Sequence, residues 1–422
     1  MSDDNTINGV DDGIISLNFG DTNAVWIPSK IEKQAIKSEA ITIRNLGPIK
    51  DITIDDIKPF TVFIGESAGG KSVIMRTITL FRWFFKQQNL HTYLLTSKIP
   101  QSSPWGDVLD NFEYAGLIDF VGTETEIQYT VTFDNESQPP FQLEFKSKKL
   151  ETSGSIPIGG ISYCKLSYIT ETRGFLSHIL NSKGSRPAFE PHFEEVVEDF
   201  EKARAKQNVF DIDFLQVRFS AEKADFGWKH HVSGLGDLLY RINFHNSASS
   251  IQNTVPMLLL ASYFTHDFNL TDAFNQALLK MVMKSGKLTD FRPVANTDIL
   301  PKHVFLHIEE PELGLFPDAQ CSLINSLIAF SMCETCNPIR LMLTTHSPYI
   351  LNHLNLLIKA HDTKNTEFTD GASLNYDDIA AYYVTDGGIE DLKRIVNQRL
   401  IDTDTLSDTL NDIYDRYEEL EA

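Results

Sequence analysis

A glycine-rich segment between an apolar run and a helix-forming run constrains this chain more than any other feature. The segment fits the spacing G-x-x-x-x-G-K-S and consists of Gly65, Glu66, Ser67, Ala68, Gly69, Gly70, Lys71 and Ser72. Residues 60–64 predict a buried strand and residues 72–85 a helix, the order that a phosphate-binding loop requires. Glycines let successive N–H groups point into one concavity, and the helix start adds partial positive charge. A chance glycine-rich turn is therefore disfavoured.

The last two residues of this loop suit different parts of a nucleotide. Lys71 would reach the β- and γ-phosphates as a point charge, and the hydroxyl of Ser72 would bind Mg²⁺. The segment as a whole therefore predicts a binding site for the phosphates of ATP, with Mg²⁺ as the cofactor.

Two acidic residues follow a second apolar run, residues 304–308. A strand of a parallel sheet delivers such residues at its carboxyl end, where Glu309 would bind Mg²⁺ and Glu310 would orient or deprotonate the attacking water. The alternative is a solvated acidic turn. The phosphate loop elsewhere in the chain favours the catalytic interpretation.

A histidine ends a third predicted strand, residues 339–343. His346 can donate a hydrogen bond to a γ-phosphate and so report its presence. A lone loop histidine is more often a surface or core residue, but Thr345, Ser347 and Pro348 beside it favour the sensor role. The sequence thus predicts ATP hydrolysis, with Lys71, Glu310 and His346 as its catalytic residues.

Together these segments resemble the ATP-binding-cassette type of ATPase head in the SMC, RecF and OLD families. The resemblance is strongest to the subgroup in which E-E-P-E precedes a turn and P-x-x-Q, here residues 309–320. It runs from about Ile41 to the C-terminus and implies an α/β P-loop NTPase fold, a mixed sheet flanked by helices. Stand-alone members are similar to the anti-phage ATPases of Septu, PARIS and retron-associated systems. This kinship implies a sensor that regulates a separate effector, a nuclease.

Heads of this kind also carry a serine-rich signature that caps the ATP of a partner head. The best match lies in residues 247–253, with Ser249, Ser250 and Gln252 as predicted nucleotide contacts. The typical form S-S-G-x-Q would place serine at Ala248 and glycine at Ser250. An N-cap role for Ser249, before a helix beginning at Thr254, has comparable weight. The resemblance implies a homodimer or larger homo-oligomer. No residue convincingly matches the glutamine usual between loop and signature.

The order of the motifs predicts four ranges: an N-terminal extension (1–38), the first part of the head (39–90), inserted strands followed by a mostly helical lobe (91–245) and the second part of the head (246–422). Within the lobe, residues 126–133 and 141–145 alternate as strands, and residues 191–207 form a charged helix. Residues 41–54 predict a hairpin. The chain lacks sustained heptads, which argues against a long-armed chromosome-structuring protein.

The formal charge of −21 disfavours general nucleic-acid binding, which depends on neutralising phosphates. The runs Lys146–Lys149 and Lys202–Lys206 are local candidates, although solvated faces explain both. The sequence has neither a membrane-length apolar run nor a signal-peptide pattern, so we expect a cytoplasmic protein. Cys333 and Cys336 have metal-ligand spacing without a second pair, and predict a helix end.

Three features leave alternatives open. Arg173 ends a predicted strand and could contact nucleotide, the opposite subunit or an acidic neighbour. Asp402 and Asp404 have the spacing of a nuclease metal site, but an N-cap at Asp404 or Thr405 of the following helix is sufficient explanation. That helix has one predicted apolar face, made of Leu406, Leu410, Ile413 and Tyr414.

Rival functions also remain open. One is a RecF-like DNA-repair ATPase that binds DNA directly, and another is an ATP-switched scaffold without catalysis. A transporter head is the weakest rival, because the L-S-G-G-Q signature typical of transporters is missing.

Overall fold

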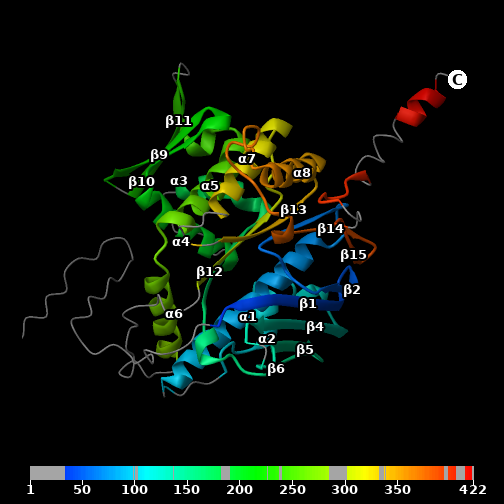
Figure 1. Ribbon diagram of the computed structural model, residues 1–422. Coiled ribbons are helices and arrows are strands. Elements are labelled where there is room, and N and C mark those ends of the chain that lie inside the picture. The colour runs from blue at the N-terminus through cyan, green and yellow to red at the C-terminus, as the bar shows by residue number, and fades with distance from the viewer. Residues whose placement is uncertain are drawn as a thin grey trace, which may run out of the picture.

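A six-stranded sheet with the order β15-β14-β3-β13-β12-β7 crosses the middle of the molecule (Figure 1). All neighbours are parallel except β14 and β15, which form an antiparallel pair. Its strands are β3 (Phe60–Gly65), β7 (Tyr163–Ile169), β12 (Lys302–Glu309), β13 (Ile339–Thr345), β14 (Ile379–Thr385) and β15 (Gly388–Asp391). This computed structural model describes residues 34–97, 99, 103–135, 137–181, 191–225, 227–236, 240–284, 302–331, 337, 339–393, 398–404 and 414–420.

The three predicted strands that precede the motifs are confirmed as β3, β12 and β13. They read as continuous apolar runs because both faces of a parallel sheet are covered. Residues 304–309 and 341–345 are buried without a break. This is the α/β arrangement that the sequence predicts, with strand, loop and helix in P-loop order.

Helix α1 (Lys71–Thr96) extends well beyond the predicted end at residue 85 and lies between two sheets (Figure 1). On one side, Phe81 and Phe85 pack against the ring of Tyr129. On the other side, the helix packs against β12 and β13. Burial on both sides explains why an apolar helix continues past Gln87 and Gln88.

The second sheet has the order β2-β1-β4-β5-β6 and is antiparallel. Its strands are β1 (Ile36–Leu46), β2 (Ile49–Ile54), β4 (Val121–Phe133), β5 (Phe141–Lys146) and β6 (Lys149–Ser153). The predicted hairpin and the predicted strands at residues 126–133 and 141–145 are confirmed, and these two strands pair with each other. Strand β4 pairs along β1, and β7 pairs with β12, so strands from within residues 91–245 join both of these sheets. The four domain boundaries stay a prediction.

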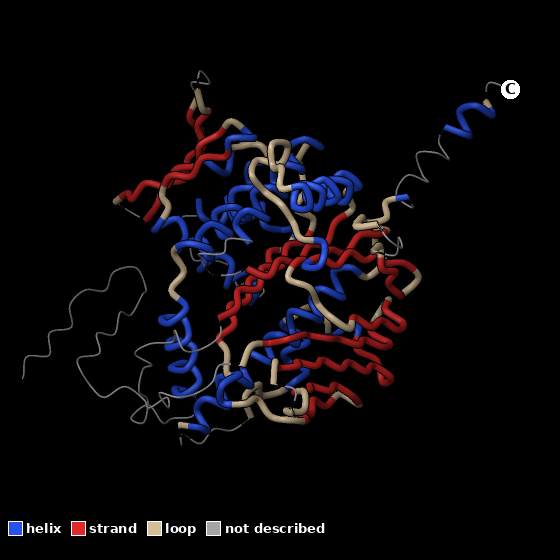
Figure 2. The backbone as a smooth tube through the Cα atoms, viewed as in Figure 1, coloured by secondary structure: helices blue, strands red, loops and turns tan. Residues whose placement is uncertain are grey.

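The third sheet, with the order β11-β10-β9-β8, lies at one end of the molecule with helices between it and the central sheet (Figure 2). Its strands are β8 (Val209–Ile212), β9 (Val217–Ala224), β10 (Gly227–Gly234) and β11 (Arg241–Asn243). The remaining longer helices are α2 (Val108–Tyr114), α3 (Leu176–Asn181), α4 (Pro191–Lys206), α5 (Ser249–His266), α6 (Leu270–Lys284), α7 (Pro317–Ser331) and α8 (Pro348–Thr363). Helix α4 confirms the predicted charged helix.

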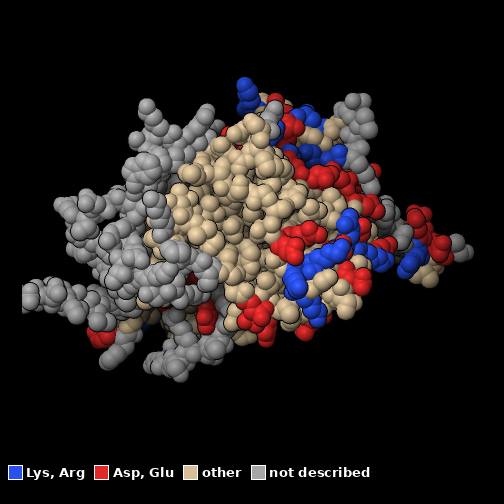
Figure 3. Space-filling view, turned by 90° about the horizontal axis from the view of Figure 1, so that it is seen from below, with Lys and Arg blue, Asp and Glu red and all other residues tan. Residues whose placement is uncertain are grey.

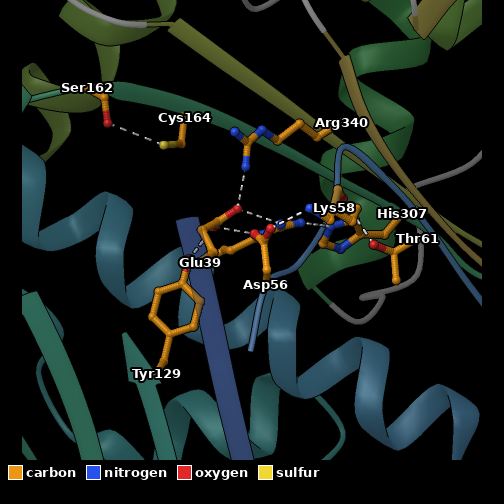
Figure 4. Close-up of polar contacts among 10 residues, drawn as sticks. Glu39, Asp56, Lys58, Thr61, Tyr129, Ser162, Cys164, His307 and Arg340 are labelled. Carbon is orange, nitrogen blue, oxygen red and sulfur yellow. Dashed lines mark hydrogen bonds and ion pairs between the residues drawn. The ribbon is translucent and has the colours of Figure 1, made fainter. Parts of the chain in front are cut away.

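A buried ion cluster joins α1 to the strands around it (Figure 4). Glu39 is fully buried on β1, and its carboxylate accepts hydrogen bonds from Arg82 Nε (3.1 Å) and Nη2 (2.8 Å). Arg340 Nη1 also donates to Glu39 (2.8 Å), as does the hydroxyl of Tyr129. Burial raises the pKa of Glu39, but the charges of Arg82 and Arg340 and the hydrogen bonds lower it to about 2. We call these residues, together with His307, the Glu39 cluster.

The hydrogen bonds of His307 fix its tautomer. Arg82 Nη1 can only donate, so Nε2 of His307 accepts its bond (2.9 Å). The proton then sits on Nδ1 and is donated to Thr79 Oγ1 (2.6 Å), which donates onward to the carbonyl of Met75 (2.7 Å). The cluster thereby ties the helix of the phosphate loop to the strand that carries the two acids.

Each of the two basic runs contains a cation that is paired with a neighbouring carboxylate. Lys146 pairs with Glu126 (2.6 Å), and Arg204 is buried beside Glu201 (3.4 Å). On the face shown in Figure 3, basic and acidic side chains are interleaved. No helix within the described part of the chain is long and apolar enough to cross a membrane.

Several predictions fall on residues that the structure does not describe. These are the extension up to residue 33, Cys333 and Cys336, and the helix residues Leu406, Leu410 and Ile413. Tyr414, predicted on the apolar face of that helix, is 67% exposed.

Candidate nucleotide site

Three adjacent parallel strands bring the predicted motifs to one edge of the central sheet. Ile64 at the end of β3 lies opposite Thr345 of β13, and Thr344 lies opposite Glu309 of β12. The loop after β3, the acids ending β12 and the histidine after β13 therefore leave the sheet side by side. This is the edge at which ligands bind in open α/β sheets.

The backbone of the loop requires glycine at two positions. Gly65 has φ 151°, and a Cβ there would lie 2.3 Å from the carbonyl oxygen of Val384. Gly70 caps α1 with φ 103°, and a Cβ there would lie 2.5 Å from Cδ1 of Ile49. Side chains at either position would push the loop away from its neighbours.

Lys71 is buried and folded onto its own loop. Its Nζ donates to the carbonyls of Gly65 (3.0 Å) and Glu66 (2.7 Å). Burial lowers the pKa of Lys71, while the carboxylates of Glu310 and Glu312 act in the opposite direction. An anionic phosphate in the loop would add to these two charges and favour the protonated lysine.

Glu309 is buried beside the first turns of α1. Tyr168 donates to its Oε1 (2.5 Å), and Arg76 Nε lies 3.6 Å from the same atom. Its Oε2 is buried without a hydrogen-bond partner. Burial raises the pKa of Glu309, but Glu171, Arg76, Tyr168 and Ser72 more than offset this and lower it. The two predicted metal ligands, Ser72 and Glu309, are thus neighbours, with one carboxylate oxygen to spare.

Glu171, which the sequence did not single out, lies next to Glu309. The close approach of its carboxyl to that of Glu309, its burial and the negative charge of Glu309 raise the pKa of Glu171 to about 7. Among the described residues, no group of three or more His, Cys, Asp or Glu could hold a metal ion.

Glu310 and His346 face each other at the site. His346 Nε2 lies 3.5 Å from Glu310 Oε1, and both side chains are 35% exposed. Glu310 has φ 44°, a left-handed conformation that residues with a Cβ rarely adopt. Its N–H donates to the carbonyl of Thr344 (2.8 Å). The catalytic roles of Lys71, Glu310 and His346 stay predictions.

Arg173 contacts backbone carbonyls of its own chain, and a contact with nucleotide or with the opposite subunit stays a prediction. It lies in the short helix η3 (Glu171–Phe175) and is 1% exposed. Nη1 donates to the carbonyls of Thr170 (3.1 Å) and Glu309 (2.7 Å), and Nη2 donates to the carbonyl of Glu310 (2.6 Å). Burial lowers its pKa to about 10, against the opposing effect of carboxylates led by Glu312.

Two side chains fasten the turn after the acids to the histidine segment. Glu312 Oε1 accepts the backbone N–H of His346 (2.7 Å), while its Oε2 is buried without a partner. Ser347 caps α8 by accepting the N–H of Ile350 (3.3 Å) and donates to Gln320 Oε1 (2.5 Å). The P-x-x-Q pattern contained the signal for Gln320, and the third glutamate of E-E-P-E the signal for Glu312.

The signature-like segment forms the first turn of α5. The helix starts at Ser249, so the N-cap is Ala248, without a side-chain bond, and the prediction that Ser249 caps a later helix is wrong. Ser249 is exposed and Ser250 half-buried. A Cβ on Gly314, in the turn after the acids, would lie 3.1 Å from Ser249 Oγ.

The side-chain amide of Gln252 is hydrogen-bonded within its own chain, mainly to the loop before α5. It accepts from Ser177 (2.8 Å) and donates to the carbonyls of His245 (3.1 Å) and Ser247 (2.7 Å). Nucleotide contacts of Ser249, Ser250 and Gln252 stay predictions, and none of the contacts above joins them to the phosphate loop of the same chain.

Residues 277–351 match the AAA ATPase domain family. The match includes Glu309, Glu310 and His346 and leaves the phosphate loop outside. No curated protein matches the chain.

Solved structures with similarity include the SMC head domain from Thermotoga maritima, with TM-score 0.35, 10% identity and coverage of 85% of this chain and 98% of that one. An SMC head bound to the C-winged helix domain of ScpA has a TM-score of 0.36 and 14% identity, with coverage of 83% of this chain and 95% of that one. The recombination mediator RecF with ATP has a TM-score of 0.36 and 10% identity, with coverage of 84% of this chain and 99% of that one. Similarity at this level says nothing of the chemistry, which the residues themselves must support.

Proposed function

We propose that this chain binds MgATP and hydrolyses it. The observation that carries the proposal is the register of β3, β13 and β12, which delivers the phosphate loop, His346 and the two acids to one sheet edge. Phosphoryl transfer needs mainly positioning and electrostatic stabilisation, and these groups supply both.

Ser72 and Glu309 are the residues that would hold Mg²⁺. The fit rests on the buried Oε2 of Glu309, which has no hydrogen-bond partner and lies on a carboxylate whose pKa is lowered. When bound, the ion would neutralise charge on the β- and γ-phosphates.

The other residues divide the remaining work. Lys71 would leave its loop carbonyls for phosphate oxygens, which are stronger acceptors because they are charged. Glu310 would accept a hydrogen bond from the attacking water and orient it. His346, 3.5 Å from Glu310, would donate to the γ-phosphate and so couple its presence to the catalytic carboxylate.

We propose further that ATP is enclosed between two copies of the chain. The first turn of α5 offers uncapped N–H groups beside the exposed Ser249, a geometry suited to a phosphate from a partner's nucleotide. A monomer would then bind ATP and hydrolyse it slowly.

The resemblance to stand-alone anti-phage ATPases supports a role as sensor and regulator of a separate effector, a nuclease. The pairing of Lys146 and Arg204 with acidic neighbours gives direct DNA binding no support from these two sites.

The test combines nucleotide binding, phosphate release and native mass of the full chain. Parent protein should bind ATP, release phosphate and dimerise with MgATP; Lys71→Ala should lose binding, and Glu310→Gln should bind and stay dimeric. Lys149→Ala, an exposed lysine on β6, is the matched control. Phosphate release by Glu310→Gln at the parental rate would overturn the catalytic assignment. Dimerisation without turnover in the parent would favour an ATP-switched scaffold.

A further inference from the structure

We propose that Arg173 is a positioning residue that holds Glu310 in its left-handed backbone conformation, with the carboxylate facing His346. The inference rests on the proposed ATPase function and adds a residue to it. Arg173 acts on the chemistry through Glu310 and needs no contact with nucleotide.

The first support is the identity of the groups that accept hydrogen bonds from Arg173. A buried guanidinium ordinarily pairs with a carboxylate, because an uncompensated charge is costly away from water. Arg173 instead donates to three backbone carbonyls, those of Thr170, Glu309 and Glu310, at 3.1, 2.7 and 2.6 Å. Two of them belong to the consecutive acids of the site. The side chain therefore holds the backbone at the end of β12 by hydrogen bonds.

The second support is the backbone of Glu310. Its φ of 44° is unfavourable for an L-residue and persists only where surrounding contacts hold it. The N–H on one side of its Cα is bonded to Thr344 (2.8 Å), and the carbonyl on the other side accepts from Arg173. With both peptide units fixed, the Cα–Cβ bond of Glu310 has one direction, and the carboxylate at the end of this side chain lies 3.5 Å from His346.

The third support is the shape of the guanidinium. Its two terminal nitrogens lie in one plane and reach the carbonyls of Glu309 and Glu310 at the same time. A lysine ammonium is a point charge on a flexible stem and cannot fix both peptide planes. Because Arg173 is bonded to carbonyls rather than to carboxylates, Glu310 keeps its own carboxylate for the water and for His346.

The experiment compares Arg173→Lys with parent protein in steady-state ATP hydrolysis and in equilibrium binding of a fluorescent ATP analogue. We expect kcat to fall about 10²-fold, the typical penalty for a misplaced catalytic group, with the KM for ATP and the Kd of the analogue changing less than about threefold. Arg204→Lys, a buried arginine on α4 that lies over the ring of Trp228, is the matched control. It should lower the melting temperature and keep kcat.

Two kinetic outcomes would overturn the proposal. One is parental kcat in Arg173→Lys, and the other is a loss of analogue binding in proportion to kcat, which would make Arg173 a nucleotide contact. Crystal structures of both proteins supply the second measurement. Arg173→Lys should lose the positive φ at Glu310 and the Glu310–His346 approach; retention of both refutes the positioning role. This structural result decides the matter even if the parent chain fails to hydrolyse ATP, an outcome that would refute the proposed function instead.

Discussion

The Glu39 cluster and the nucleotide site are two buried polar regions built on the same helix and strand. Residues 307 and 309 point to one face of β12, so His307 meets Thr79 of α1 while Glu309 meets Arg76 of α1. In the cluster, both oxygens of Glu39 accept hydrogen bonds from cations. In the site, the Oε2 atoms of Glu309 and Glu312 are buried without a partner.

This difference separates structural from reactive polarity. A satisfied buried network fixes the fold, whereas unsatisfied buried acceptors are a cost that a protein keeps where a ligand supplies the missing partners. Changes in the cluster should therefore alter stability, and changes in the site should alter chemistry.

The largest effect should come from Glu310→Gln. The amide keeps the size of the side chain and its approach to His346 but cannot accept a proton, so kcat should fall by about 10²–10⁴-fold. The melting temperature should change little, because the side chain is 35% exposed. Phosphate release and thermal unfolding are the measurements. A large loss of stability would contradict the division between the two regions.

Glu39→Gln should produce the reverse pattern. It leaves the guanidinium of Arg82 buried without its carboxylate, which costs about 3–5 kcal/mol of unfolding free energy. The kcat of the folded fraction should stay within about twofold of the parent, since additivity holds for sites without shared partners. Urea unfolding and ATPase assays measure the two quantities, with the exposed Glu151→Gln on β6 as control. A kcat loss as large as that of Glu310→Gln would show that the regions are one functional unit.

Lowering the pH should gradually remove the stabilisation that the ionised carboxylate of Glu39 provides. The pKa of Glu39 is lowered from 4.5 to about 2 in the folded chain, so its stabilisation is present above pH 4.5 and is lost as pH falls towards 2. The difference in unfolding free energy between parent and Glu39→Gln should narrow across this interval. A difference that is constant from pH 7 to pH 2.5 would mean that the carboxylate charge is not the source.

The smallest effect should come from Gly314→Ala, which probes the contact between the site and the signature-like turn. Gly314 has φ 75°, and an added Cβ would press on Ser249 Oγ at 3.1 Å. We expect the free energy of unfolding to fall by about 1–3 kcal/mol, measured by urea unfolding. Gly371→Ala is the matched control, since its φ is 84° and nothing lies within 4 Å of the added atom. Equal losses in both variants would show that only backbone strain matters. A larger loss in Gly314→Ala measures the contact.

Local patterns were sufficient for the strands and for the motifs. Strands β3, β12 and β13 are continuous apolar runs, and the alternation in β4 and β5 shows which residues face the core. The parallel register that gathers the motifs follows from strand pairing, which the P-loop pattern already implies.

Residues that reach the site through tertiary pairing could not be predicted. Tyr168 and Glu171 come from the end of β7, and they meet Glu309 only because β7 pairs with β12. Glu39 resembles an ordinary polar position of an edge hairpin. Its partners Arg82 and Arg340 lie 43 and 301 residues away, so no local window contains the cluster.

The signature-like segment shows the same limit. The sequence suggested a helix from Thr254, but α5 begins at Ser249, and its first turn lies next to Gly314 from a distant part of the chain.

The register of β3, β13 and β12 also has an evolutionary consequence. The parallel pairing that puts Ile64 opposite Thr345 and Thr344 opposite Glu309 sets the spacing of the motifs, and the backbone hydrogen bonds of this pairing do not depend on which apolar side chain occupies the strand interior. Valine, isoleucine and leucine can replace one another in the strands at a modest cost in stability without moving the site. Selection can therefore rewrite nearly the whole core while the geometry at the sheet edge is inherited unchanged.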